Sequence, residues 1–414
     1  MDDFKKPIKK IRIEPTNNFQ QPKVDHAEHF GSDYSRLESI PTVNIGDDKE
    51  QQQYTHTPLK KEGLGSKMAV FFKNKKVIVI FSVVAIILAG GAIFYFLNKN
   101  KSESATSTVQ TVETKTVEKK IVSPLTGTVL KDPKLAERPV TALMIENSPD
   151  ARPQSGLTDA DVVYEAIAEG GVTRFMAVYQ ESQPQYIGPI RSARPYYIDY
   201  ALPLEASYGH VGGSPEALRD IKQLGVRDID QFFNDSSYWR ITDRFAPHNM
   251  YTSFEKLDAL NKTKGYVSSK FTGFERKEAV AQTPTANVID FAISGPLYSP
   301  RFEYDQTTNS YKRIQAGQPH TDAKSGATIS PKVVVALVVQ NGSDGDGYHS
   351  TYTTSGSGAV YVFQDGIVSE GTWSKKDRQS PLVLTDKNGL PLKLNSGQTW
   401  VSLVGTSSDI TYKP

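Results

Sequence analysis

The sequence contains no cysteine among its 414 residues. This absence excludes disulfide bonds, thiolate metal sites, a cysteine nucleophile and a lipid-modified cysteine anchor. The chain also lacks a large excess of charge of one sign, because its 48 Lys and Arg residues nearly balance its 46 Asp and Glu residues. The composition therefore gives no nucleic-acid signal. The glycine-loop spacings of nucleotide sites and the His-Glu-x-x-His spacing of zinc enzymes are missing too. We therefore expect no cofactor and no metal site.

Long apolar runs are scarce, and the one long enough to cross a membrane is residues 77–97, VIVIFSVVAIILAGGAIFYFL. At about 1.5 Å per residue a helix of this length spans the hydrocarbon core of a bilayer, so we expect a transmembrane helix. The flanking lysines are Lys67, Lys73, Lys75 and Lys76 before the run and Lys99 and Lys101 after it. This bias predicts a single-pass protein of the cell membrane with its N-terminus in the cytoplasm and its C-terminal part outside.

The polar segments around this run show no sustained hydrophobic period. Residues 1–76 are predicted to form a disordered cytoplasmic tail, because scattered single hydrophobes cannot bury enough surface to offset the entropy of ordering. Residues 98–123 are rich in Ser, Thr, Lys and Glu, which favours an extended extracytoplasmic stalk.

The part after the stalk divides into two patterns. Within residues 124–273 strand-like and helix-like segments alternate, which favours an α/β-type domain. The expected strands are 140–145, 172–179 and 207–211, and the expected helices are one capped by Thr158 and ended by Gly170-Gly171, one from the Ser214 cap to Leu224, and one starting at Thr252 or Ser253.

Residues 284–412 lack helical signals and are predicted to form a β-rich C-terminal domain. The run KVVVALVVQ at 332–340 is apolar enough for a central strand, and Asp365-Gly366 and Asn388-Gly389 are hairpin turn signals. The predicted fold class is therefore α+β, with an α/β-type exported domain, a β-rich domain, one transmembrane helix and a disordered tail.

Three segments of the first domain concentrate unusual residues, namely IGPIRSARP at 187–195, YGHVGGSPEA at 208–217 and WRITDRFAPHNMY at 239–251. Together with MIEN at 144–147 and GQTWV at 397–401, they resemble the YerB-like family of bacterial envelope lipoproteins, a two-part domain of unknown function. The resemblance implies an envelope location and no particular reaction. Members commonly carry a lipid-modified cysteine, and this chain departs from them in having none.

The candidate ligand-binding residues come from these segments. Arg191 and Arg194 offer two guanidinium groups for phosphate or carboxylate, although a pair of structural ties to acidic residues is the alternative. Gly212, Gly213 and Ser214 precede a predicted helix and can aim N–H groups at an anion, unless they form only a tight turn with an N-cap. The remaining ligand-binding candidates are Arg244 and Asn249.

The catalytic candidates are His210 and His248, which titrate near neutral pH and can serve in acid–base chemistry. Their possible carboxylate partners are Glu146, Glu165, Glu169 and Asp243. The alternative for each histidine is a packed, hydrogen-bonded core residue. The segment at 341–347, NGSDGDG, resembles a calcium loop in composition but lacks the terminal glutamate spacing, so we expect a turn there.

Two functions of different class remain open. The first is a membrane-anchored binding or scaffold protein that recognises an anionic envelope polymer or peptide, with a possible protein partner. The second is an envelope hydrolase that uses His210 or His248, with Arg191 and Arg194 orienting an anionic substrate. Buried, closely packed histidines and arginines would favour the scaffold, whereas an open cleft that gathers them would favour the enzyme.

Overall fold

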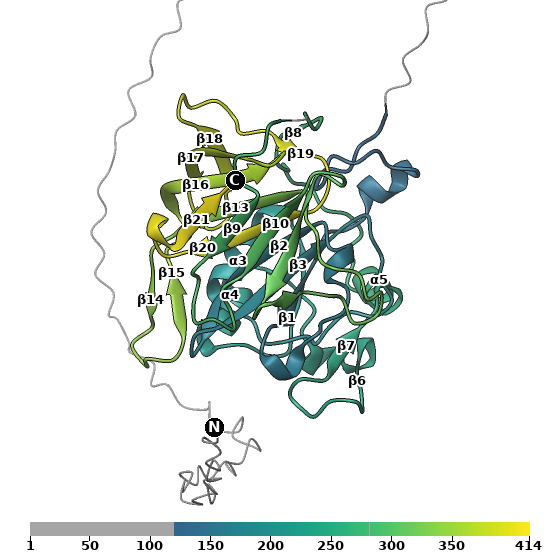
Figure 1. Cartoon of the computed structure of the whole chain (residues 1–414). Coiled ribbons are helices and arrows are strands. Elements are labelled where there is room, and N and C mark those ends of the chain that lie inside the picture. Colours follow the sequence, from purple (N-terminus) through teal and green to yellow (C-terminus); the bar gives the residue numbers. More distant parts are fainter. Residues whose placement is uncertain (1–119, 281) are drawn as a thin grey trace, which may run out of the picture. The chain divides into compact units, whose positions relative to one another are not determined.

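A mixed ten-stranded sheet organises residues 120–280 and 282–414, which are the residues that this computed structural model describes (Figure 1). The strand order in the sheet is β18-β17-β16-β13-β20-β2-β3-β1-β4-β5. Its strands, in chain order, are β1 Thr141–Glu146, β2 Val162–Glu169, β3 Val172–Tyr179, β4 Ser207–Gly209, β5 Arg227–Asp228, β13 Val333–Val338, β16 Gly356–Gln364, β17 Ile367–Lys375, β18 Val383–Asp386 and β20 Thr399–Val404.

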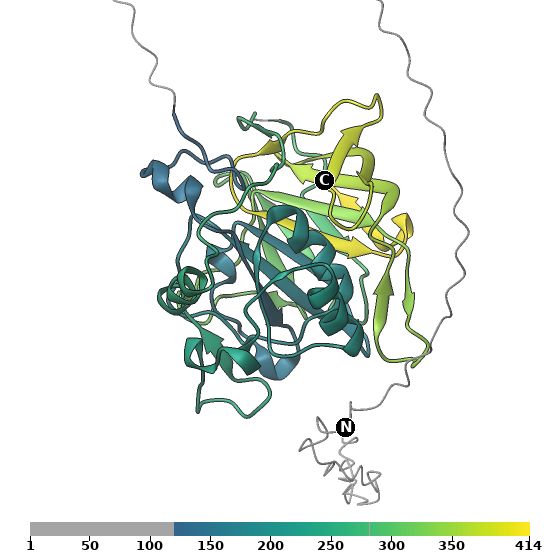
Figure 2. The same cartoon turned by 180° about the vertical axis from the view of Figure 1, so that it is seen from behind.

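The two faces of this sheet carry separate apolar cores, one of which is closed by helices and the other by a second sheet (Figures 1 and 2). The helices α3 Pro195–Ala201 and α4 Pro215–Gln223 bury aromatic and aliphatic side chains in the first core. The second core is covered by α5 Phe254–Thr263 and by a five-stranded sheet. The strands of that sheet are β9 Val288–Phe291, β10 Arg301–Asp305, β11 Ser310–Gln315, β12 Gln318–Pro319 and β21 Ile410–Lys413.

Three short pairs complete the described strands. They are β6 Tyr238–Arg240 with β7 Met250–Thr252, β8 Arg276–Lys277 with β19 Leu394–Asn395, and β14 Asn341–Ser343 with β15 Ser350–Tyr352.

Strands from both predicted segments share the large sheet. β20, near the C-terminus, lies between β13 and β2 and is parallel to both. Its contact with β2 runs from Val162 opposite Thr399 to Glu165 opposite Ser402. Backbone hydrogen bonding of the sheet is therefore continuous across the sequence boundary between residues 273 and 284.

The predicted fold class was wrong. The described residues are mostly β-sheet with few helices, and the first segment is not the expected α/β domain with helices between its strands. Within the described ranges no helix combines the length and the apolar character needed to span a bilayer. The predicted span at 77–97, the tail and the stalk up to residue 119 lie outside these ranges.

The clearest error is the helix expected between Thr158 and Gly170, where the chain forms β2. The side chains of Val162 and Tyr164 enter the core under the helices, and that of Val163 enters the opposite core, so the alternation of a strand buried on both faces holds this segment. Gly170 and Gly171 have φ values of +55° and +78°. This pair forms the two-residue hairpin turn from β2 to β3, in which both central residues need positive φ.

Other sequence predictions were confirmed. Ser214 caps α4, and its Oγ accepts a hydrogen bond from the backbone N–H of Ala217. The run at 332–340 forms the central strand β13, and Asp365-Gly366 turns β16 into β17. For α5 the cap is Ser253 rather than Thr252, and α3 was not predicted.

Candidate functional site

Several predicted site residues meet at one edge of the large sheet. β1, β4 and β5 are parallel to each other, and β1 and β2 are both antiparallel to β3, so these four strands point the same way. Glu146 and Glu169 end β1 and β2, and His210 directly follows β4. In sheets with parallel strands, ligands commonly bind at the carboxyl ends of the strands.

Glu146, Ser148, Arg191 and His248 form what we call the Glu146 cluster. Glu146 Oε1 lies 2.9 Å from His248 Nδ1 and 3.5 Å from Arg191 Nε, and it accepts a hydrogen bond of 2.9 Å from Ser148 Oγ. The Glu146 side chain is 5% exposed, whereas those of Arg191 and His248 are 27% and 23% exposed. Glu146 Oε2 is buried and has no hydrogen-bond partner among the described residues.

Backbone hydrogen bonds fix Arg191 between two strands of this edge. Its N–H donates to the carbonyl oxygen of Met144 at 2.8 Å, and its own carbonyl oxygen accepts from the N–H of Val211 at 3.1 Å. The guanidinium group is thereby held beside the end of β1, with its outer part reaching solvent.

Arg194 belongs to a different, more buried group. Its Nη2 lies 2.5 Å from Glu169 Oε2, and Arg174 pairs with the other oxygen of Glu169. Burial raises the pKa of Glu169, but the charges of Arg174 and Arg194 outweigh that effect, and the net pKa lies below the ordinary value. This arrangement matches the structural-tie alternative, because the Arg194 side chain is only 7% exposed.

His210 is fully buried and both of its ring nitrogens have protein partners. Nδ1 lies 2.8 Å from the carbonyl oxygen of Gly212, and Nε2 lies 3.1 Å from Asp228 Oδ1. The ring therefore ties the end of β4 to the end of β5. The structure does not bring it to the same carboxylate as His248.

The glycine turn after β4 is also engaged within the protein. The N–H of Gly212 donates to Asp230 Oδ1, and the N–H of Ser214 donates to the carbonyl oxygen of Ala193. Gly213 lies against Ala193, whose Cβ would be 3.1 Å from a Cβ at that position, so the turn packs closely on the loop of Arg191 and Arg194.

The remaining candidates lie on the loop between β6 and β7. Arg244 donates to the carbonyl oxygens of Ala151 and Pro153, and Asn249 donates to those of Ile241 and Arg244. These two side chains hold the loop that carries His248. Asp243 is exposed, and its side chain accepts from the neighbouring Thr242 hydroxyl.

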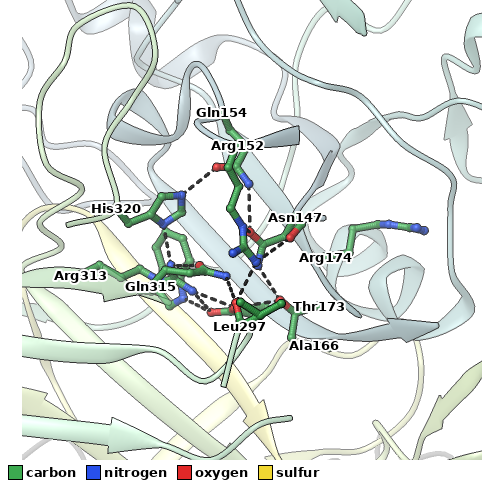
Figure 3. Close-up of polar contacts among 12 residues, drawn as sticks. Asn147, Arg152, Gln154, Ala166, Thr173, Arg174, Leu297, Arg313, Gln315 and His320 are labelled. Carbon is green, nitrogen blue, oxygen red and sulfur yellow. Dashed lines mark hydrogen bonds and ion pairs between the residues drawn. The ribbon is translucent and has the colours of Figure 1, made fainter. Parts of the chain in front are cut away.

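A buried polar network, which the sequence analysis missed, crosses between the two sheets (Figure 3). Arg313 from β11 forms an ion pair with Glu165 from β2, with Nη2 at 2.8 and 2.9 Å from the two carboxylate oxygens and both side chains 0% exposed. Trp400 Nε1 also donates to Glu165, at 3.0 Å. The guanidinium carbon lies 4.6 Å from the centre of the Trp400 ring.

His320 extends this network toward the Glu146 cluster. Because a guanidinium group only donates, Nδ1 of His320 must accept from Arg313, which leaves Nε2 to donate to Gln154 Oε1. Gln154 in turn donates to the carbonyl oxygen of Glu146 and to Asn147 Oδ1. Burial, followed by the charge of Arg313, lowers the pKa of His320 well below its usual value, which agrees with a neutral ring.

A signal for Arg313 was present in the sequence. Tyr311, Arg313 and Gln315 are spaced by two residues and therefore share one face of a strand, and all three are buried in β11. An arginine in phase with a buried tyrosine indicates a partner acid on the facing sheet. Nothing local identifies that acid as Glu165, which is 148 residues away.

The arrangement at the sheet edge supports two kinds of chemistry. Arg191 and His248 both reach solvent beside a single buried carboxylate, which suits recognition of an anion. A carboxylate at 2.9 Å from Nδ1 also orients the His248 ring, as in acid–base sites.

Comparison with known proteins shows which family the chain belongs to. Residues 125–267 match the model of the N-terminal domain, and residues 289–401 that of the C-terminal domain, of a protein of unknown function, DUF3048. The fold and these matches define a two-part protein in which both parts build one large sheet. The chain belongs to this family, as the resemblance to YerB-like proteins predicted.

A curated sequence and a solved structure, both named YerB and both from Bacillus subtilis, show the same relationship. The chain is 32% identical to the putative lipoprotein YerB of Bacillus subtilis strain 168 over 292 residues, which are 69% of this chain and 87% of the relative. It is also similar to the crystal structure of the YerB protein from Bacillus subtilis, with a TM-score of 0.64 and 28% identity, over 71% of this chain and 100% of that one.

Proposed function

We propose that the protein is an extracytoplasmic, membrane-anchored binding protein of the bacterial envelope that recognises an anionic envelope component through the Glu146 cluster. The envelope location is supported by the name of the Bacillus subtilis relative, which describes a lipoprotein. A binding or scaffold role is supported by the close packing of Arg194 and His210, which are paired inside the protein and leave no free catalytic pair there.

The observation that carries this proposal is the partial exposure of an arginine and a histidine side chain beside one buried acid. Arg191 and His248 both lie beside Glu146 Oε1, and their side chains are partly exposed to solvent. An incoming phosphate or carboxylate would meet a donor from each of them, and the contacts with Glu146 keep both side chains in place.

We expect Arg191→Gln to weaken binding of poly(glycerol phosphate), an anionic polymer, by about tenfold, since one charge-assisted contact is lost. The fold should persist, because this side chain reaches solvent and Glu146 retains His248 and Ser148. The measurement is polymer binding to the full chain at several salt concentrations, with thermal unfolding of each variant in parallel.

The matched control is Arg219→Gln, which removes an exposed arginine on α4 and should leave binding unchanged. Equal binding by wild type and Arg191→Gln would reject the site. Equal losses in both variants would show general attraction to positive charge and would reject it as well.

A hydrolase is the second candidate. The contact with Glu146 favours His248 over His210 as its acid–base residue. Nδ1 faces the carboxylate at 2.9 Å, while Nε2 faces the exposed Asp150, 4.0 Å away, so the outer nitrogen is the one that reaches solvent. Such a ring can accept a proton from water that attacks a bound phosphodiester, and it can return that proton to the alcohol oxygen that leaves when the P–O bond breaks.

In that case the full chain should release small fragments from poly(glycerol phosphate), and His248→Gln should slow the release by about a hundredfold. Fragment release is followed by chromatography, and thermal unfolding shows whether the variant stays folded. A wild-type chain that binds the polymer without cleaving it would reject the hydrolase and retain the binding protein.

A further inference from the structure

A second candidate binding site lies beside the β6–β7 pair and involves none of the Glu146 cluster. A shallow, wide-open surface hollow of about 560 Å³ lies there. It is lined by Gln185, Trp239, Ser253, Glu255 and Lys256.

Trp239 forms the aromatic wall of this hollow. Behind it, the ring of Tyr186 lies 5.9 Å from the Trp239 ring and 4.7 Å from the Tyr251 ring, measured between centroids. The backbone of Trp239 pairs with that of Tyr251 across the two strands. The indole is therefore held by a tyrosine cluster and a strand pair, with part of its surface exposed.

The other lining groups are polar and include both donors and acceptors. Gln185 carries an amide, Glu255 a carboxylate and Lys256 an ammonium group, and all three residues are exposed. The side chains of Gln185 and Lys256 are held by contacts with the backbone. Gln185 Oε1 accepts from the N–H of Glu255 at 3.2 Å, and Lys256 Nζ donates to the carbonyl oxygen of Ser236 at 2.8 Å.

This combination fits a sugar better than the other common ligands. Hydroxyl groups both donate and accept, so they match a mixed set of amide, carboxylate and ammonium groups. The C–H face of a sugar ring is apolar and packs on an aromatic ring. A polyanion would meet the carboxylate of Glu255, and an apolar peptide would find a single aromatic wall.

We propose that this hollow binds an oligosaccharide chain of the envelope, with one sugar ring packed on Trp239 and its hydroxyls bonded to Gln185, Glu255 and Lys256. The site is independent of the Glu146 cluster, so its failure and that of the anion site are distinguishable.

Tryptophan fluorescence gives a direct test, because Trp373 and Trp400 are 2% and 0% exposed and Trp239 is the accessible indole of the three. Quenching of the full chain by acrylamide should therefore report mainly on Trp239. We expect a chitin-derived or a cellulose-derived oligosaccharide to lower the quenching constant by about twofold, because the sugar covers the ring.

Affinity for the same oligosaccharides is measured by calorimetry on three variants. Trp239→Ala and Glu255→Ala should each weaken binding by about tenfold or more. Glu255 is exposed, so its variant keeps the test valid if removal of the indole disturbs the local fold. Tyr348→Ala, which removes an exposed aromatic ring from the turn between β14 and β15, is the matched control and should bind normally.

Absence of shielding by both oligosaccharides would overturn the proposal. Unchanged affinity in both Trp239→Ala and Glu255→Ala would also overturn it, because the sugar would then bind elsewhere.

Discussion

Arg313→Met is expected to lower the free energy of unfolding by about 3–5 kcal/mol, the usual cost of leaving one partner of a buried ion pair without the other. Methionine fits the space, because Phe175, Phe302 and Trp400 surround the guanidinium group. What remains is the charge of Glu165, fully buried and held only by neutral donors such as Trp400 Nε1. Urea unfolding of the full chain measures the change.

Two comparisons isolate the buried charge as the cause. The double variant with Glu165→Gln and Arg313→Met should regain part of the stability, since no uncompensated charge remains. The control Arg301→Met breaks an ion pair between Arg301 and Asp290, whose side chains are 47% and 41% exposed. It should lower the free energy of unfolding by only about 0–1 kcal/mol. A loss in Arg313→Met no larger than in Arg301→Met would contradict the prediction.

The fold was predictable where local signals agreed with long-range packing. At α4, the Ser-Pro-Glu start and the glycine exit describe a helix that also buries Ala217 and Ile221. At 158–170 a cap residue and a glycine pair also predicted a helix, but the chain forms the strand β2 there. The cap residues belong to a short turn at Leu157–Asp159, and the glycine pair belongs to a hairpin. Placement of β2 between β3 and β20 favours the strand, and β20 comes from the far end of the chain.

The candidate site was predictable in composition and less so in pairing. The sequence singled out Glu146, Arg191 and His248, which the structure brings together. It grouped Arg194 with Arg191 and His210 with His248, whereas Arg194 contacts Glu169 and His210 contacts Asp228. Motif proximity along the chain shows which residues share a loop. It does not show which carboxylate each side chain meets, because strand order sets that and the sequence leaves the order open.

Cleavage of the chain between the two matched segments, residues 125–267 and 289–401, should leave them associated. The predicted domain limits of 124–273 and 284–412 stay predictions. We expect a chain cut at a protease site inserted between Glu278 and Thr283 to remain one particle, because these two residues are exposed and β20 stays hydrogen-bonded to β2. Both apolar cores contain side chains from both fragments, as does the pair of Glu165 and Arg313. Either fragment produced alone would expose the apolar side chains that it contributes to both cores and should show no cooperative unfolding.

Size-exclusion chromatography of the cut protein, with and without urea, measures this association. The uncut chain is the control for elution position, and co-expression of the two fragments from separate messages tests whether they assemble without the covalent link. Fragments that separate in buffer and each unfold cooperatively would contradict the prediction. They would show that the β2–β20 hydrogen bonds and the buried ion pair join two units that are stable by themselves. In that case Arg313→Met should lower the free energy of unfolding by only about 1 kcal/mol, as at a weak interface between domains.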